Sequence, residues 1–227
     1  MIRLANNTPL NNPTIVQHST CLGVVLAGGL SSRMGIDKAS LQRNKVDMLS
    51  YSKQLLTGSG INNIVISGQP SCSSQQDVLV ADKYKEAGPM GGIASVIEKY
   101  KPAALLILPV DLPLMTMEAL QKLKQVGELS QQACFYNDNY LPLYLPVNAH
   151  TENFLKTAFI HQAKQNPSNE KMDNKSFVHN NMAKSKSGPS MRALLNQIPH
   201  KAISINTLAS LFNANTPEDW ALAQKRF

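Results

Sequence analysis

Cysteine is scarce in this chain of 227 residues, which has only Cys21, Cys72 and Cys134, placed far apart. No Cys-x-x-Cys pair and no Cys/His spacing typical of zinc occurs, so the sequence predicts neither a disulfide framework nor a structural zinc. Thiols that stay reduced are typical of the cytoplasm. We therefore expect a cytoplasmic protein.

Long hydrophobic runs are also missing. The longest apolar runs are far too short to span a bilayer. Residues 1–20, with several Asn, Pro and Thr, hold no apolar segment of a secretory signal. We expect no membrane partner, and a flexible N-terminal extension over residues 1–20. The hydrophobic fraction of 43% argues against wholesale disorder, and the length suits one well-buried domain.

Acidic residues are fewer than basic ones. The chain has 15 Asp and Glu against 22 Lys and Arg, which gives a formal net charge of +7. This balance suits anionic ligands such as a triphosphate and a phosphorylated acceptor, and it could also serve nucleic acid. No basic run carries interleaved aromatic residues, so the sequence favours small anions and predicts no nucleic-acid partner.

The run from Leu26 to Lys38 reads LAGGLSSRMGIDK and gathers several ligand-binding residue types. The apolar residues 22–26 are typical of a buried parallel strand that leads into it. Glycines let the backbone turn sharply, and successive amides of such a turn form a nest for anions. Arg and Lys add cations suited to phosphate. The run predicts a triphosphate site with the candidate residues Leu26, Ala27, Gly28, Gly29, Ser31, Arg33 and Lys38.

Two better-known nucleotide motifs do not occur in this run. It is neither Gly-x-x-x-x-Gly-Lys-Ser/Thr nor Gly-x-Gly-x-x-Gly. An ordinary strand-to-helix turn with solvated Arg33 and Lys38 would explain the glycine pair alone. It does not explain the full run, with Arg-Met-Gly and Asp-Lys in order.

Asp111 is the candidate metal ligand. The most hydrophobic run, residues 103–109, predicts a central strand, and Asp111 follows it in the context Val-Asp-Leu-Pro. Ligands of open α/β sheets bind beyond the carboxyl ends of the strands. Mg²⁺ prefers few carboxylates together with phosphate oxygens and water. The alternative is that Asp111 caps the helix expected to begin near Thr116.

The remaining sequence alternates between expected strands and helices and shows no internal repeat. We expect further strands at 39–41, 64–66, 77–82, 132–136, 141–145 and 201–205, a turn at 44–47, and helices at 47–56, 88–100, 116–126, 148–165 and 216–224. This order predicts one α/β domain over residues 21–227, a three-layer α/β/α, doubly wound fold with a mostly parallel sheet. The polar residues 166–189 are predicted to form a flexible loop.

The motifs together resemble the molybdenum cofactor guanylyltransferases, within the nucleotidyltransferases of Rossmann-like fold. The resemblance covers about residues 23–219. Besides the opening run it rests on Gly-Pro-x-x-Gly-Ile at 88–93, Asp-x-Pro at 111–113 and Asn-x-Asn-Thr-Pro-Glu at 213–218. The chain departs from the family at Ser67, where relatives tend to have asparagine, and over residues 44–49.

The resemblance implies transfer of GMP from GTP to the phosphate of molybdenum-molybdopterin, with release of pyrophosphate and with Mg²⁺ as cofactor. It implies catalytic roles for Arg33, Lys38 and Asp111, the last as metal ligand. The other residues that it implies are Ser67, Asp82, Gly88, Gly91 and Gly92 for the nucleotide, and Arg192, Asn213 and Asn215 for the acceptor. It also implies transient contacts with molybdoenzymes or cofactor-delivery proteins.

The residues alone support nucleotidyl transfer and leave the base open. A cytidylyltransferase acting on the same or another phosphorylated acceptor is therefore an alternative. Because of Ser67 and residues 44–49, a nucleotide-binding regulatory module without catalysis is a second alternative.

Overall fold

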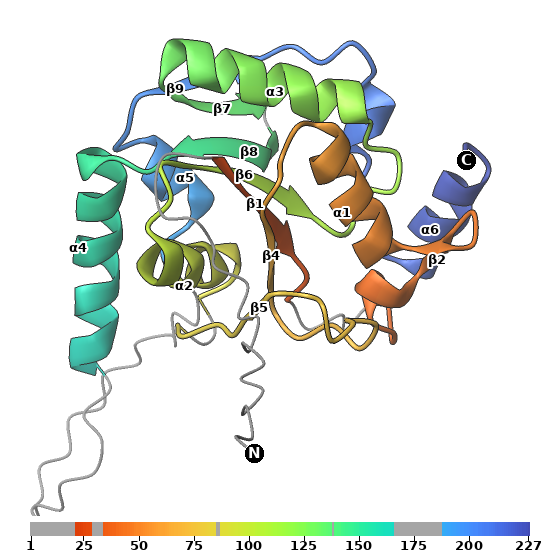
Figure 1. Cartoon of the computed structure of the whole chain (residues 1–227), viewed down its shortest axis with the longest axis horizontal. Coiled ribbons are helices and arrows are strands. Elements are labelled where there is room, and N and C mark those ends of the chain that lie inside the picture. Colours follow the sequence, from red (N-terminus) through yellow and green to blue (C-terminus); the bar gives the residue numbers. More distant parts are fainter. Residues whose placement is uncertain (1–20, 29–33, 85–86, 138, 166–187) are drawn as a thin grey trace, which may run out of the picture.

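The computed structural model describes residues 21–28, 34–84, 87–137, 139–165 and 188–227 (Figure 1). The predicted N-terminal extension and most of the predicted loop at 166–189 lie outside these residues. The elements, in chain order, are β1 (Cys21–Leu26), η1 (Lys38–Ser40), β2 (Gln42–Arg43), β3 (Val46–Asp47), α1 (Met48–Gly58), β4 (Ile64–Ser67), β5 (Leu79–Val80), α2 (Pro89–Tyr100), β6 (Ala104–Pro109), α3 (Met117–Ser130), β7 (Ala133–Tyr136), β8 (Asn139–Pro146), α4 (Ala149–Gln165), α5 (Met191–Leu195), β9 (His200–Ile203), η2 (Leu208–Leu211) and α6 (Pro217–Gln224).

A seven-stranded sheet in the order β5-β4-β1-β6-β8-β7-β9 forms the centre of the molecule. Strands β5, β4, β1 and β6 pair in parallel, β8 runs antiparallel to both β6 and β7, and β9 pairs in parallel with β7. The predicted mostly parallel, doubly wound sheet is confirmed. Because β1 and β6 are paired and parallel, their carboxyl ends lie together at one edge, where such sheets bind ligands.

Helices cover both faces of the sheet, which gives the predicted three layers (Figure 1). On one face, α2, α4 and α5 pack against side chains such as Val24 of β1 and Ile107 of β6. On the other face, α1 and α3 pack against Val25, which follows Val24 in β1, and Leu106, which precedes Ile107 in β6. This alternation follows from the two-residue period of a strand. All four side chains have no measurable exposure, so β1 and β6 are anchored from both sides.

Local sequence signals fix the starts of the helices. Thr116 and Ser190 accept hydrogen bonds from Ala119 and Ala193 as the N-caps of α3 and α5. Pro89 occupies the first turn of α2, where its missing N–H costs no helical hydrogen bond. Helices α2 and α3 confirm the helices predicted at 88–100 and 116–126 to within a few residues.

The segment after the opening run differs from its prediction. The expected strand at 39–41 is wrong, because Lys38–Ser40 forms a 3₁₀ helix whose N-cap, Asp37, accepts a hydrogen bond from the Ala39 amide at 3.0 Å. The expected turn at 44–47 is confirmed at Asn44 and Lys45, which form the tip of a short β2–β3 hairpin with φ of 48° and 68°. Residues 46–47 belong to strand β3 instead.

The expected strand at 77–82 is shorter in the structure, where β5 is Leu79–Val80. Asp77 belongs to the preceding turn and accepts hydrogen bonds from the Ser74 amide and from Nζ of Lys53 in α1. Among the described residues, no helix combines the length and apolar character needed to cross a lipid bilayer.

Candidate nucleotide-binding site

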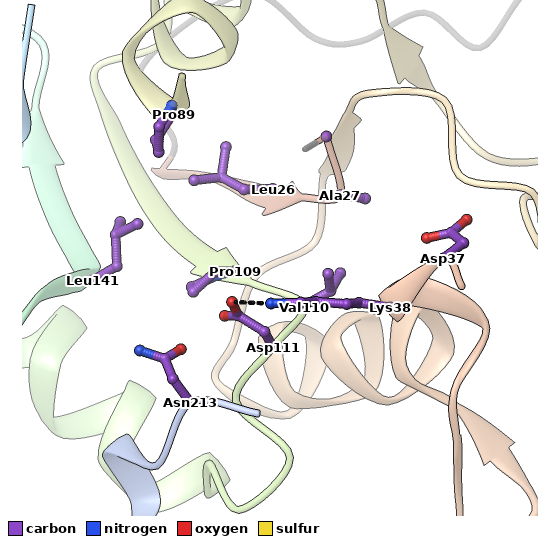
Figure 2. A pocket seen from close by; sticks show the side chains of 11 residues that line it. Leu26, Ala27, Asp37, Lys38, Pro89, Pro109, Val110, Asp111, Leu141 and Asn213 are labelled. Carbon is purple, nitrogen blue, oxygen red and sulfur yellow. Dashed lines mark hydrogen bonds and ion pairs between the residues drawn. The ribbon is translucent and has the colours of Figure 1, made fainter. Parts of the chain in front are cut away.

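A cavity of about 280 Å³ lies beyond the carboxyl ends of β1 and β6. Its lining residues are Leu26, Ala27, Gly28, Asp37, Lys38, Pro89, Pro109, Val110, Asp111, Leu141 and Asn213 (Figure 2). The two strands stay joined at their ends, because the Val110 amide donates to the Leu26 carbonyl at 3.2 Å. The described ends of the predicted opening run, at Gly28 and Lys38, therefore share this cavity with the predicted metal ligand Asp111.

Lys38 is the centre of the polar contacts in this cavity. Its Nζ lies 3.1 Å from Asp111 Oδ2 and 2.6 Å from Asn215 Oδ1 (Figure 2 shows the pair with Asp111). The side chains of Lys38 and Asp111 are 17% and 23% exposed, so both are screened from bulk water but open to a ligand. An ammonium has three donors, and these contacts use two of them, which leaves one for an anion.

Asp111 lies just beyond β6, and its backbone is held as well as its side chain. Its carbonyl accepts a hydrogen bond from the Ala214 amide at 2.9 Å. The N-cap of α3 is Thr116, whose hydroxyl accepts from Ala119 at 3.2 Å. The alternative in which Asp111 caps that helix is therefore wrong, and its carboxylate is available to the cavity.

Asn213 and Asn215 lie in the segment between η2 and α6, at the side of the cavity and of Lys38 respectively. Asn213 lines the cavity, and Asn215 holds Lys38. The capping box of α6 fixes this segment, since Thr216 and Asp219 each accept a hydrogen bond from the other's backbone amide. Asp219 also accepts from the Asn215 amide at 3.0 Å, and this hydrogen bond together with those from Thr216 lowers the pKa of Asp219.

Asp37 is a lining residue that the sequence reading did not single out. Its carboxylate accepts hydrogen bonds from Ala39 at 3.0 Å and from the amide and hydroxyl of Ser71 at 2.8 and 2.9 Å. Burial alone would raise the pKa of Asp37, but these hydrogen bonds outweigh it and lower the pKa. Asp37 thereby ties the Lys38 turn to the loop after β4. The sequence signal that could have pointed to Asp37 was its position directly before Lys38 in the opening run.

Gly68 is a second missed position. Its φ of 118° is strained for other residues, and a Cβ there would lie 2.7 Å from the Gly28 nitrogen. The Ala27 amide donates to the Ser67 carbonyl at 2.9 Å just before this approach. The loop after β1 can therefore lie against the end of β4 only because Gly68 has no side chain.

The glycines of α2 have a packing role. Pro89 lines the cavity and Gly88 is an exposed N-cap with φ of 59°, so the helix N-terminus borders the site. Gly91 and Gly92 are buried one turn further in. A Cβ on Gly91 would lie 2.8 Å from the Asp82 carboxylate.

Gly92 packs against Ser67, which is 5% exposed between β4 and α2. Neither Ser67 nor Asp82 lines the described cavity. Their predicted contacts with the nucleotide stay predictions, as do those of Gly91 and Gly92.

Other predicted site residues lie elsewhere. Gly29, Ser31 and Arg33 fall outside the described residues. Arg192 is exposed on α5 and does not line the described cavity, so its role toward the acceptor stays a prediction.

The three cysteines are free thiols and lie outside the cavity lining. Burial, as the main cause, raises the pKa of Cys21 to about 12 and that of Cys72 to about 11. Both are therefore protonated, weak nucleophiles at neutral pH.

Comparison with known proteins agrees with the geometry. Residues 23–170 match the family described as the MobA-like NTP transferase domain. A molybdenum cofactor guanylyltransferase of Xanthomonas euvesicatoria pv. vesicatoria is 33% identical over 88% of this chain and 92% of its own length. A probable molybdenum cofactor guanylyltransferase of Nostoc sp. is 26% identical over 90% of each chain.

Solved structures share the fold. The molybdopterin-guanine dinucleotide biosynthesis protein A of Archaeoglobus fulgidus superposes with a TM-score of 0.63 at 17% identity, over 90% of this chain and 97% of the other. The 2-C-methyl-D-erythritol 4-phosphate cytidylyltransferase of Thermus thermophilus gives 0.57 at 13% identity, over 91% and 98%. Proteins that handle different bases thus share this architecture, so the fold alone does not select the base.

Proposed function

This chain belongs to the MobA-like NTP transferase domain family, and from that premise we propose that it transfers GMP from GTP to the phosphate of molybdenum-molybdopterin. One observation carries the proposal: Lys38, Asp111 and Gly28 meet in one cavity beyond two parallel strands. The guanylyltransferase relatives, aligned over most of their length, support the choice of GTP and of the acceptor.

In the proposed reaction, an oxygen of the acceptor phosphate forms a bond to the α-phosphorus of GTP. The bond from this phosphorus to the oxygen that bridges to the β-phosphorus breaks, and pyrophosphate leaves with the electron pair. The acceptor phosphate is already an anion, so no strong general base is required. Catalysis then depends on holding two anions in line and offsetting their charge.

The residues of the cavity suit this task. The loop at Gly28 brings backbone without a side chain to the cavity wall, and the N-terminus of α2 at Pro89 borders it. Lys38 supplies a fixed cation with one donor free for a phosphate oxygen. Because Asp111 and Asn215 hold that cation in advance, little reorganisation is needed when the triphosphate binds.

We propose Mg²⁺ as the cofactor, held by Asp111 together with triphosphate oxygens and water. The donor set fits, because Mg²⁺ prefers one or two carboxylates and Asn213 adds an amide oxygen nearby. Within the described ranges, no group of three His, Cys, Asp or Glu residues could hold a metal without the substrate. When bound, the ion supplies charge neutralisation at the phosphates.

A nucleotide screen tests this function. The purified chain is given molybdenum-molybdopterin, Mg²⁺ and either GTP, CTP or ATP, and released pyrophosphate is measured. We expect acceptor-dependent release with GTP. Release with CTP alone would make the chain a cytidylyltransferase. Binding of GTP by calorimetry without any release would make it a nucleotide-binding module.

A further inference from the structure

Arg43, at the end of β2, contacts three segments outside its own hairpin without lining the cavity. Its Nε donates to the Pro113 carbonyl at 2.8 Å, two residues beyond Asp111. Its guanidinium carbon lies 4.2 Å from the ring centre of Tyr51 and 4.9 Å from that of Phe227. A guanidinium can stack on aromatic faces while its N–H groups donate in fixed directions, so it can join segments that a single apolar contact would not.

Phe227 extends these contacts to α6. Its ring packs edge-on against Trp220, with ring centres 5.7 Å apart. Trp220 belongs to a small hydrophobic cluster that is separate from the two faces of the main sheet. The buried members of this cluster are Met34, Leu41, Met48, Ala214 and Trp220.

The same cluster bears directly on the polar site. Ala214 lies between Asn213, which lines the cavity, and Asn215, which holds Lys38, and the Ala214 amide donates to the Asp111 carbonyl at 2.9 Å. Leu41 follows the 3₁₀ helix that begins with Lys38. The segments that carry Lys38, Asp111 and Asn215 are far apart in the sequence and meet at the cavity. Arg43 joins the first of these segments to the Pro113 carbonyl beyond Asp111 and to Phe227 after α6.

We propose that Arg43 is a positioning residue, which fixes the segments of Lys38, Asp111 and Asn215 relative to one another. Its effect on turnover rests on the proposed function, whereas its effect on Lys38 does not. Loss of the guanidinium frees the Pro113 carbonyl and separates Tyr51 from Phe227. The contacts that hold the Lys38 ammonium then open more often.

Chemical labelling of Lys38 tests the positioning directly. Each purified variant is acetylated briefly with a soluble ester, and labelling at single lysines is followed by mass spectrometry. In Arg43→Gln we expect Lys38 to be labelled about threefold faster, because its contacts open more often. Lys53, which lies in α1 and pairs with Asp77, is the internal control, and we expect its labelling rate to stay unchanged. Equal acceleration at Lys53 would mean general loosening and would overturn the proposal.

Arg226→Gln is the matched variant. Arg226 precedes Phe227, is exposed, and makes no side-chain hydrogen bond or ion pair with the described residues. The Arg226→Gln variant removes one positive charge next to Phe227, as Arg43→Gln does, so we expect Lys38 to be labelled at the wild-type rate. Faster labelling in both variants would assign the effect to charge rather than to the contacts of Arg43, and would contradict the proposal.

Kinetics add the link to function. In Arg43→Gln we expect kcat for pyrophosphate release to fall about tenfold, while the Kd of GTP changes less than about twofold, because the alignment of groups suffers more than binding. If Lys38 labelling rises but even the wild-type chain releases no pyrophosphate, the positioning stands and the proposed function fails. If the wild-type chain turns over and labelling is unchanged, the positioning role fails.

Discussion

Lys38 Nζ and Asp111 Oδ2 lie 3.1 Å apart although 73 residues separate them in the sequence. Lys38 begins η1, which follows β1 in the chain, and Asp111 lies two residues beyond β6, the strand that pairs in parallel with β1. A cation and an anion held together at this edge can each take a part of a metal–triphosphate complex. In the proposed complex, Lys38 would face phosphate oxygens and Asp111 would hold the metal. The first two predictions below therefore change Asp111 and Lys38 one at a time.

Asp111→Asn keeps the shape of the side chain and removes its charge. We expect kcat for pyrophosphate release to fall by about a hundredfold or more, because the proposed ligand of Mg²⁺ is lost. Circular dichroism and the Tm should stay close to wild type, since Asp111 is partly exposed and its backbone bond to Ala214 remains. Unchanged turnover would remove the metal role from this residue.

Lys38→Ala removes the cation that Asp111 and Asn215 hold. We expect kcat/KM for GTP to fall about a hundredfold or more, because a preorganised charge at the phosphates is lost. Lys53→Ala is the control, a lysine that is also ion-paired but lies on α1 away from the cavity lining. Each lysine change between residues 171 and 186 should also cost less than Lys38→Ala. Similar losses in Lys38→Ala and the control variants would show that the phosphate site lies elsewhere.

Asp37→Asn tests the tie between the Lys38 turn and the loop after β4. Hydrogen bonds lower the pKa of Asp37 in the folded chain. Its stabilising effect is therefore fully present above the unfolded pKa of about 4 and is lost as the pH falls through the lower folded value. We expect the variant to have a lower Tm at pH 7, and its deficit against wild type to shrink between about pH 4 and pH 2.

A thermal scan from pH 7 to pH 2 measures this difference. A deficit that does not change with pH would mean that the charge of Asp37 is not what stabilises the tie to Ser71.

Gly92→Ala tests the packing of α2 on β4. A methyl group there would collide with the Ser67 hydroxyl and would lie 3.2 Å from Ser67 Cβ. We expect a loss of about 1–3 kcal/mol in the free energy of unfolding, despite the better helix propensity of alanine. Ser67→Ala removes the hydroxyl, so the double variant should recover most of the loss in a urea titration. A Gly92→Ala variant as stable as wild type would show that the fit is loose.

The sequence predicted the sheet and the partners of the site because both depend on local patterns. Buried runs such as residues 22–26 mark strands of the parallel part, and the end of such a strand is the place where Asp111 can act. Pairing of neighbouring parallel strands then brings the two ends together. Asn213 and Asn215 were expected near the site because the Asn-x-Asn-Thr-Pro-Glu motif resembles that of the guanylyltransferase family, and their predicted contact with the acceptor stays a prediction.

The parts that sequence reasoning missed depend on contacts between distant segments. The Lys38 turn forms a 3₁₀ helix because Asp37 caps it and Ser71, from another loop, holds Asp37 in place. The role of Gly68 depends on its approach to Gly28. The contacts of Arg43 need Phe227, which is distant in the chain. No local pattern of residues encodes such contacts.

The most direct measurement follows the α-phosphorus of GTP. GTP labelled at the α-phosphorus or at the γ-phosphorus is incubated with the chain, Mg²⁺ and molybdenum-molybdopterin, and the labelled products are separated. We predict that the α-label appears in the dinucleotide product and the γ-label in pyrophosphate, with both signals lost in Asp111→Asn. An α-label that stays in free GTP, or a dinucleotide that Asp111→Asn forms at the wild-type rate, would contradict the account.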